Sequence, residues 1–199
     1  MPEARKKMGI VEHRGLIYII GGYTYTYNPL HDLLSYNPVT GEWKNLAPML
    51  GPPSKTIGVA VLDNFFGYMD FYNPMHDLLS YNPVTGEWRA LAGRAPPRYN
   101  YMGVAVLNNF LYLVGGLLFN EEAEKSLERY SFEQEDDWTG ISSMVTPRCH
   151  FGLCAHEGYL YAFGGRTKGC DYISPNIERY DPFADEWRLL ESNMPKVIS

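Results

Sequence analysis

The hydrophobic residues of this chain fall into short runs separated by turn residues, and the same order of runs recurs along the chain. Between Glu157 and Trp187, an apolar run ends at Gly164-Gly165, a loop follows, and a shorter run ends at Tyr180 before the turn Asp181-Pro182. The four tryptophans lie at positions 43, 88, 138 and 187, so one tryptophan closes each copy. Short apolar runs at a fixed period of about 40–50 residues are typical of strands in a β-repeat protein.

Each copy predicts four strands, here called A to D in chain order. The A and B runs are nearly continuously apolar, as strands buried on both faces should be, whereas C and D alternate more. Three of the B runs are expected to end at a Gly-Gly pair, and the second copy has Phe66-Gly67-Tyr68-Met69-Asp70 there instead. The pattern predicts one domain over residues 1–199, with repeats at approximately 8–46, 57–91, 102–141 and 151–190.

Two copies share a nearly identical segment. Residues 27–43 recur at 72–88 with a single difference, Leu30 against Met75. Repeats that stack in one protein normally diverge further than this. The near-identity indicates a recent duplication or gene conversion, or else an error in the assembled sequence.

Composition narrows the class of protein. The chain is 45% hydrophobic and 20% charged, with many Tyr, Gly and Pro, and its net charge of -6 disfavours nucleic acid or an anionic membrane as a partner. No apolar stretch reaches the roughly 18–20 residues of a membrane span, and the charged N-terminus is not followed by the apolar core of a signal peptide. Three irregularly spaced cysteines fit a reducing compartment better than a disulfide framework. We therefore expect a cytoplasmic protein.

The motifs as a set resemble the kelch repeat. These motifs are the Gly-Gly pair, Glu178-Arg179-Tyr180-Asp181-Pro182 and the Glu-Trp pair that follows the turn, and together they cover nearly the whole chain. The resemblance implies an all-β fold, a kelch-type β-propeller of four-stranded antiparallel blades. Four blades are present, and kelch propellers usually close with about six, so both ends of the chain would fall inside a longer array.

The segment Tyr36–Trp43, read as Y-N-P-V-T-G-E-W, is most similar to the kelch-like proteins. In that family a BTB domain binds a cullin scaffold, a BACK domain follows, and the propeller captures the protein to be ubiquitinated. The resemblance therefore implies a non-catalytic protein-binding module, like the substrate-recognition propeller of a cullin-type ubiquitin ligase adaptor. Cullin would be reached only through a BTB domain that this chain does not contain. The alternative is a kelch protein that binds actin or the cytoskeleton.

Propellers of this family bind peptides at one face, through two sets of residues. Residues just after Gly-Gly form one set, and residues two before the Gly of strand A form the other. Carried onto this chain, these candidate protein-binding residues are Tyr23, Leu117 and Arg166, and Lys7, Thr56, Tyr101 and His150. They would make a pocket of aromatic and hydroxyl groups with a few positive charges, or they would only line a water-filled channel.

The sequence gives little support for a metal site or for a catalytic site. His150 and Cys154 share one face of a predicted strand but would lie about 13 Å apart, too far to hold one ion, and Cys154 with His156 gives only two ligands. Cys170 beside Lys168 could be a redox-sensitive thiol, although an ordinary exposed thiol is the simpler interpretation. The chain has no nucleophile elbow or phosphate loop. We expect no metal, no cofactor and no catalysis.

Two loop segments keep two interpretations each. The run from Glu121 to Lys125 is either a solvated turn or an acidic contact patch. The alternating Tyr23-Thr24-Tyr25-Thr26-Tyr27 either extends a B strand or presents exposed tyrosines to a protein partner.

Overall fold

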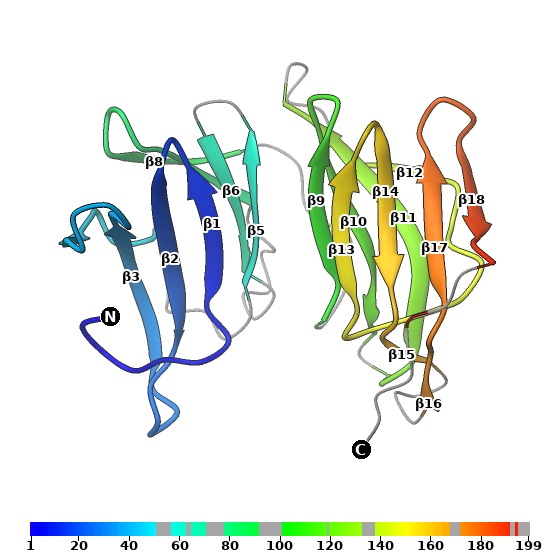
Figure 1. Ribbon diagram of the computed structural model, residues 1–199, viewed down its shortest axis with the longest axis horizontal. Helices are drawn as coiled ribbons and strands as arrows, with labels where there is room; N and C mark the ends of the chain where they lie inside the picture. The colour runs from blue at the N-terminus through cyan, green and yellow to red at the C-terminus, as the bar shows by residue number, and fades with distance from the viewer. Residues whose placement is uncertain are drawn as a thin grey trace. The chain divides into compact units, whose positions relative to one another are not determined.

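The computed structural model is all-β, as the sequence predicts (Figure 1). It describes residues 1–50, 57–62, 65–70, 78–91, 101–118, 120–132, 138–167, 172–191 and 194, and in residues 57–70 the described side chains are those of Val59 and Val61. Within these residues, no helix has the length and apolarity needed to cross a membrane.

Sixteen of the strands form four antiparallel sheets of four strands, in which neighbouring strands follow chain order. The first sheet is β1 (Gly9–His13), β2 (Leu16–Tyr23), β3 (Pro29–Tyr36) and β4 (Trp43–Asn45). The second is β5 (Ile57–Leu62), β6 (Phe65–Asp70), β7 (Leu78–Asn82) and β8 (Glu87–Ala90). The third is β9 (Gly103–Leu107), β10 (Phe110–Leu117), β11 (Ala123–Ser131) and β12 (Thr139–Ile141). The fourth is β13 (Gly152–His156), β14 (Tyr159–Phe163), β17 (Ile177–Asp181) and β18 (Glu186–Leu189), and β15 (Arg166–Thr167) pairs separately with β16 (Tyr172–Ile173).

The chain divides into two compact units, Met1–Ala95 with the first and second sheets and Pro96–Ser199 with the third and fourth. Each unit has a core of its own. The core of the first unit contains Tyr18, Ile20, Leu33, Met49, Leu79 and Tyr81. The core of the second contains Ala105, Leu107, Tyr112, Val114, Leu127, Met144, Leu160, Ala162, Tyr180 and Trp187. In both units, therefore, the apolar face of one sheet is buried against the next sheet along the chain.

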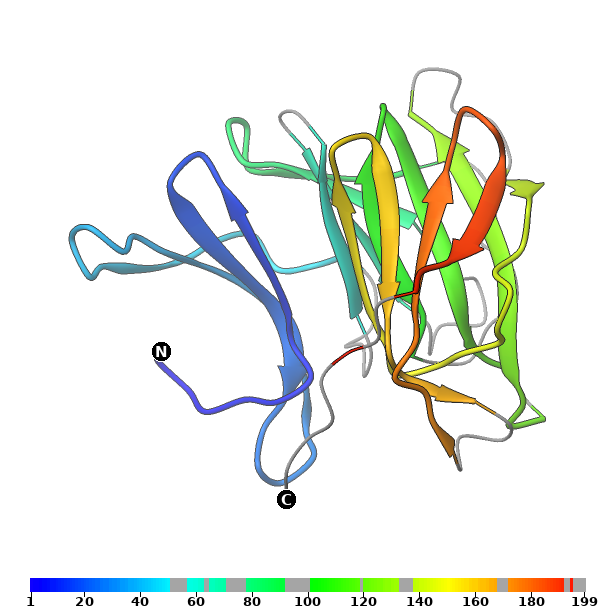
Figure 2. The same cartoon turned by 45° about the vertical axis from the view of Figure 1, so that its right-hand side comes forward.

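The period of two along a strand decides which side chains enter each core. We call the side of a sheet that faces the following sheet its forward face, and the opposite side its rear face. Tyr112 on the forward face of the third sheet meets Tyr180 on the rear face of the fourth, with ring centroids 6.1 Å apart. Trp187 lies next to Tyr180 at 5.3 Å and is 6% exposed. The Trp of strand D thus lies between neighbouring sheets, where a large aromatic side chain buries most area. Figure 2 shows the fourth sheet, yellow to red, in front of the green strands of the third.

The Gly-Gly pairs do not end every B strand, contrary to the sequence prediction. β2 and β10 continue through them to Tyr23 and Leu117, and the pairing with the C strand shifts register at the glycines. Such a shift is a β-bulge, which bends a strand without ending it, and glycine supplies the positive φ that the bend requires. Only in the fourth sheet does the B strand stop, at Phe163, before Gly164-Gly165.

The turns between strands C and D of the first, second and fourth sheets share one hydrogen-bond pattern. The side chain of the first residue accepts hydrogen bonds from the two main-chain amides that lie two and three residues later, at Asn37, Asn82 and Asp181. These are Asx turns, in which the side chain replaces a backbone acceptor. The third residue of each turn projects into solvent: Val39 is 91% exposed, Val84 70% and Phe183 101%.

Each of the two loop segments that allowed two interpretations is partly strand and partly loop. Tyr23 ends β2, and residues 24–28 form a tight turn in which the amide of Thr24 donates to the carbonyl of Asn28 at 3.0 Å. Ala123, Glu124 and Lys125 belong to β11, so the expectation of a loop over the whole acidic run is wrong, because strand C begins earlier than predicted.

The cysteines differ from one another. Cys149 is fully buried and disulfide-bonded, whereas Cys154 is a free, exposed thiol. The expectation of unpaired thiols is therefore wrong for Cys149. The interpretation of Cys170 and its neighbour Lys168 lies outside the described residues.

Candidate functional site

The predicted residues that precede strand A share an unusual backbone conformation. Lys7, Tyr101 and His150 each lie two residues before the first glycine of an A strand, and their φ angles are 56°, 62° and 54°. Residues other than glycine rarely adopt this left-handed region, and such strain tends to gather at functional sites. Thr56, the fourth member of this set, lies outside the described residues.

The main chain joins the two predicted sets in the first and fourth sheets. Tyr23, just after Gly-Gly, exchanges hydrogen bonds of 2.9 and 3.0 Å with Lys6, the neighbour of Lys7. Arg166 exchanges hydrogen bonds of 2.8 and 3.0 Å with Cys149, the neighbour of His150. The structure therefore brings the residue after Gly-Gly beside the residue before strand A in both sheets.

Glycine is required where these segments meet. A Cβ added to Gly22 would lie 2.7 Å from the carbonyl oxygen of Lys6. One added to Gly165 would lie 2.6 Å from Cβ of Phe151 and 2.8 Å from the carbonyl oxygen of Cys149. Real Cβ atoms do not approach other atoms this closely, so the Gly-Gly pair permits the contact on which this face is built.

The predicted residues differ in how much side chain they offer to a partner. Lys7, His150 and Arg166 are exposed, Tyr101 is half-buried, and Tyr23 and Leu117 are buried at 8% and 9% exposure. Tyr101 and His150 come together: their rings stack with centroids 3.5 Å apart, and the amide of His150 donates to the carbonyl of Tyr101 at 3.0 Å. In the second unit the candidate residues therefore include a stacked aromatic pair and an exposed arginine.

In the first unit the corresponding face is rich in tyrosine. Tyr25 is 91% and Tyr27 69% exposed, and the ammonium of Lys6 lies 3.8 Å from the ring centroid of Tyr27. The ring of Tyr27 packs edge-on against Tyr23 at 6.3 Å, which explains why Tyr23 is buried. Exposed tyrosines with one cation over a ring suit protein binding, because a tyrosine has few rotamers to immobilise.

A hollow lies on the Gly-Gly side of the second unit, where the loop after Leu117 meets the segment before β13. Its volume is about 690 Å³, and its lining residues are Asn120, Glu121, Glu122, Ala123, Thr146, Pro147 and Thr167. Two carboxylates stand on one wall, and Arg166 precedes Thr167 in the chain. The two carboxylates, Glu121 and Glu122, therefore give the lining of the hollow a negative charge.

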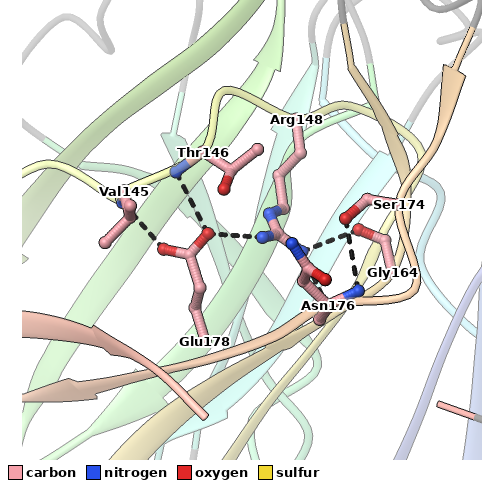
Figure 3. A network of polar contacts seen from close by, with 7 residues as sticks. All are labelled: Val145, Thr146, Arg148, Gly164, Ser174, Asn176 and Glu178. Atoms are coloured by element: carbon pink, nitrogen blue, oxygen red, sulfur yellow. Dashed lines mark hydrogen bonds and ion pairs between the residues drawn. The ribbon is translucent and has the colours of Figure 1, made fainter. Parts of the chain in front are cut away.

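A buried ion pair supports this side of the second unit, and the sequence reasoning missed it. Arg148 and Glu178 are fully buried and paired, and Figure 3 shows the guanidinium between the carboxylate and the loop that carries Gly164. Arg148 also donates to the carbonyl of Gly164 at 2.8 Å, while Glu178 accepts from the amides of Val145 at 2.7 Å and Thr146 at 3.1 Å. A buried ion pair is tolerated when hydrogen bonds satisfy both ions. This network fixes the segments that carry His150 and Arg166.

The first sheet repeats the arrangement with other residues. Arg5 pairs with both carboxylate oxygens of Asp32, at 2.7 and 2.8 Å, and donates to the carbonyl of Gly21 at 3.2 Å. In both sheets, then, an arginine donates a hydrogen bond to the carbonyl of the first Gly of the Gly-Gly pair. This arginine lies two residues before the residue whose φ is positive. The signal was present in the sequence, because Arg5 and Arg148 stand at equal distances from Gly9 and Gly152. The matching position of the third copy, Tyr99, lies outside the described residues.

Metal-ligating side chains do not gather in the described part of the chain. No group of three or more His, Cys, Asp or Glu residues there could hold a metal ion. His156 lies 3.8 Å from the carboxylate of Glu157, and both side chains are exposed.

Comparison with known proteins agrees with the geometry. Residues 4–50 and 147–194 match the Kelch motif family. An F-box/kelch-repeat protein of Arabidopsis thaliana is 41% identical over 59 residues, which cover 30% of this chain and 15% of that protein. Kelch-like protein 41 of Mus musculus is 29% identical over 89 residues, which cover 43% of this chain and 14% of that protein.

A third relative matches most of the chain. Kelch repeat and BTB domain-containing protein 1 of Vaccinia virus is 27% identical over 189 residues, which cover 92% of this chain and 33% of that protein. The chain thus spans a third or less of each of these relatives. The motif matches fall on the first and fourth sheets, and the long match extends over all four. Residues 4–50 and 147–194 therefore carry Kelch motifs, and all four sheets have the four-stranded antiparallel form of kelch blades.

Proposed function

We propose that this chain is a non-catalytic protein-binding module. In each unit taken by itself, the proposed binding surface consists of the segments that precede strand A and those that follow Gly-Gly. The observation that carries the proposal is the shared left-handed backbone of Lys7, Tyr101 and His150, which in the first and fourth sheets lies next to the pairings of Lys6 with Tyr23 and of Cys149 with Arg166. Side chains held on such a rigid main chain bind a partner at a low cost in conformational entropy.

The finer proposal is that the module captures substrates for a cullin-type ubiquitin ligase in the cytoplasm. Two kinds of support stand behind it. The relatives' names join kelch repeats to an F-box or a BTB domain, and the matched residues make up only a third of the BTB protein. The kelch-like resemblance of Tyr36–Trp43 supports the same role. In this proposal the ligase is recruited by a domain outside the 199 residues.

Peptide selection on the purified chain tests the binding module. A displayed peptide library yields a ligand, whose affinity is then measured for Tyr101→Ala and Arg166→Ala. We expect each substitution to weaken binding by about tenfold or more, as for hot-spot residues, with little change in melting temperature. The matched control is Phe183→Ala, which removes a fully exposed aromatic ring at the other end of the fourth sheet. If the control weakens binding as much as the two site variants, the proposed face is wrong.

The ligase role is tested separately, by immunoprecipitating the endogenous gene product and probing for a cullin. A cullin in the precipitate supports the adaptor role. Peptide binding without any cullin leaves a binding module and rejects the adaptor. Co-sedimentation of the chain with actin filaments would favour the cytoskeletal alternative.

A further inference from the structure

The hollow on the Gly-Gly side of the second unit contains the carboxylates of Glu121 and Glu122. Both side chains are exposed and line the hollow, and neither has an ion-pair partner among the described residues. The side-chain amide of Asn120 donates to Oε2 of Glu122 at 3.0 Å, which orients that carboxylate and leaves its charge in place. Two neighbouring carboxylates in a hollow favour a positively charged occupant.

The arginines near the hollow do not neutralise these carboxylates. Arg148 is fully buried, and its charge is already balanced by Glu178. Arg166 and Thr167 are successive residues of β15, and successive side chains of a strand point to opposite faces. Since Thr167 lines the hollow, Arg166 points away from it. Within the part of the chain that the structure describes, the lining therefore contains acidic side chains and no basic one.

The loop that carries Glu121 repeats a turn of the first sheet. The amide of Leu118 donates to the carbonyl of Glu122 at 2.9 Å, and the amide of Glu121 donates to the carbonyl of Leu118 at 3.0 Å. The matching hydrogen bonds within residues 24–28 are 3.0 and 3.1 Å long. Glu121 and Tyr27 therefore occupy the same place in the turn, and both have a left-handed backbone, with φ of 65° and 61°.

In the first sheet, the residue at this place is in contact with a cation. The ammonium of Lys6 lies 3.8 Å from the ring centroid of Tyr27. A carboxylate attracts an ammonium more strongly than a tyrosine ring does, because it carries a full negative charge. The chain thus contains one copy of the turn that contacts a cation. The second copy, at Glu121, has no ion pair within the described chain.

The rest of the lining suits a long basic side chain. Ala123 and Pro147 supply apolar surface, against which the methylene groups of lysine or arginine pack. Thr146 and Thr167 supply hydroxyl oxygens, which accept hydrogen bonds from an ammonium or a guanidinium. A metal ion is disfavoured as the occupant, since no three His, Cys, Asp or Glu side chains of the described residues form a group that could hold one.

We propose that the hollow binds a lysine or arginine side chain of a peptide segment in the partner protein. The inference rests on the proposed function, and it adds the charge that the partner must carry at one part of the binding surface. Glu121 and Glu122 select this charge, whereas Tyr101 and Arg166 bind the partner outside the hollow. A volume of about 690 Å³ holds such a side chain together with the peptide groups next to it.

Peptide selection tests the inference when it is run in parallel on the wild type and on Glu121→Gln/Glu122→Gln. We expect the peptides selected by the wild type to share a lysine or an arginine at one position, and those selected by the variant to lack this preference. Wild-type peptides without a shared basic residue overturn the inference and leave the binding module intact. A wild type that selects no peptide at all overturns both.

The affinity of a wild-type-selected peptide, measured by fluorescence anisotropy, gives the size of the effect. Glu121→Gln/Glu122→Gln should weaken binding by about tenfold or more, because the basic side chain loses both carboxylates. The matched control is Glu42→Gln/Glu87→Gln, which makes the same change of net charge at two exposed carboxylates of the first unit. This control should bind like the wild type, and circular dichroism with a thermal melt establishes that each variant is folded.

Salt and a chelator separate a direct charge contact from other causes. Raising the salt concentration should weaken the wild type more than Glu121→Gln/Glu122→Gln, because salt screens an interaction that the variant no longer makes. Adding a chelator should leave the affinity unchanged. The inference is overturned if the control loses as much affinity as the hollow variant, if salt weakens the two proteins equally, or if the chelator abolishes binding.

Discussion

Arg148 and Glu178 show how much of this structure depends on single residues. Each is fully buried, and their hydrogen bonds reach the loop at Gly164 and the amides of Val145 and Thr146. Removing one partner of a buried pair leaves an uncompensated charge in a medium of low dielectric constant. The free energy of unfolding then falls by more than the net stabilisation that the intact pair provides. The same two residues hold the segments of the candidate site, so local stability and binding geometry share one cause.

We expect Arg148→Met to lower the free energy of unfolding by about 3–5 kcal/mol, because it leaves the Glu178 carboxylate unpaired. Adding Glu178→Gln should recover part of the loss, since glutamine removes the charge but keeps an oxygen for the two amides. Urea unfolding measures both effects. Arg188→Met, which breaks the exposed pair with Glu186, is the control and should leave the midpoint almost unchanged. Equal losses for Arg148→Met and Arg188→Met would contradict this account.

At the scale of the element, the contact between the third and fourth sheets contains a carboxylate whose contribution to stability depends on pH. Asp185 lies in the turn before β18 and accepts hydrogen bonds from the hydroxyl of Tyr180 at 2.7 Å and from the amide of Ser142 at 3.0 Å. These hydrogen bonds, that of Tyr180 above all, lower the pKa of Asp185 below its ordinary value of 3.8. Burial, followed by the contact with Asp185, raises the pKa of Tyr180. Both groups therefore stay in the protonation states that the hydrogen bond requires across the neutral range.

A carboxyl whose pKa is lowered by folding stabilises the folded state above its unfolded pKa, and the stabilisation is lost as the pH falls through the folded pKa. We expect Asp185→Asn to reduce stability modestly at pH 7. The difference from the wild type should shrink as the pH falls below 3.8, the ordinary value for the side chain. Asparagine suits the comparison because it tolerates the φ of 50° at this position. Urea unfolding at several pH values measures the difference, and a gap that persists undiminished at low pH would show that the charge is not its source.

The elements themselves were largely predictable from sequence, and the site was less so. The order of strands and the place of each tryptophan follow from hydrophobic period and turn residues, which are local signals. The continuation of β2 and β10 through Gly-Gly was not predictable in this way, because a bulge and a strand end use the same residue. The residues beside Gly-Gly were found only through resemblance. The arginine networks at Arg5 and Arg148 were missed, because their acids, Asp32 and Glu178, occupy different positions in the repeat.

At the scale of the whole molecule, two cores divide the chain. Leu33 and Leu127 occupy the same position on strand C, both are 0% exposed, and each lies in the core of one unit. Among the described residues, each of these two cores lies within one unit. Compact units with separate cores are expected to open with separate free energies.

We expect Leu127→Ala to destabilise the second unit by about 2–5 kcal/mol, through the lost side chain and the cavity left behind. In hydrogen exchange followed by mass spectrometry, peptides from β9 to β14 should exchange faster and peptides from β1 to β3 should be unchanged. Leu33→Ala is the reciprocal variant and should give the opposite pattern. If either variant raises exchange equally across the chain, the two units unfold as one.

The Asx turns between strands C and D also bear on how the protein can be handled. Their shape is set by the first residue, Asn37, Asn82 or Asp181, while Val39, Val84 and Phe183 project into solvent. In the first and fourth sheets they lie at the end away from Gly-Gly, and in the second sheet at the matching end, since strand C runs from one end of a sheet to the other. Once the free, exposed thiol of Cys154 is replaced by Cys154→Ser, a cysteine introduced at position 84 or 183 would therefore carry a fluorophore or a surface tether at a fixed place, without entering the core or covering the candidate binding face.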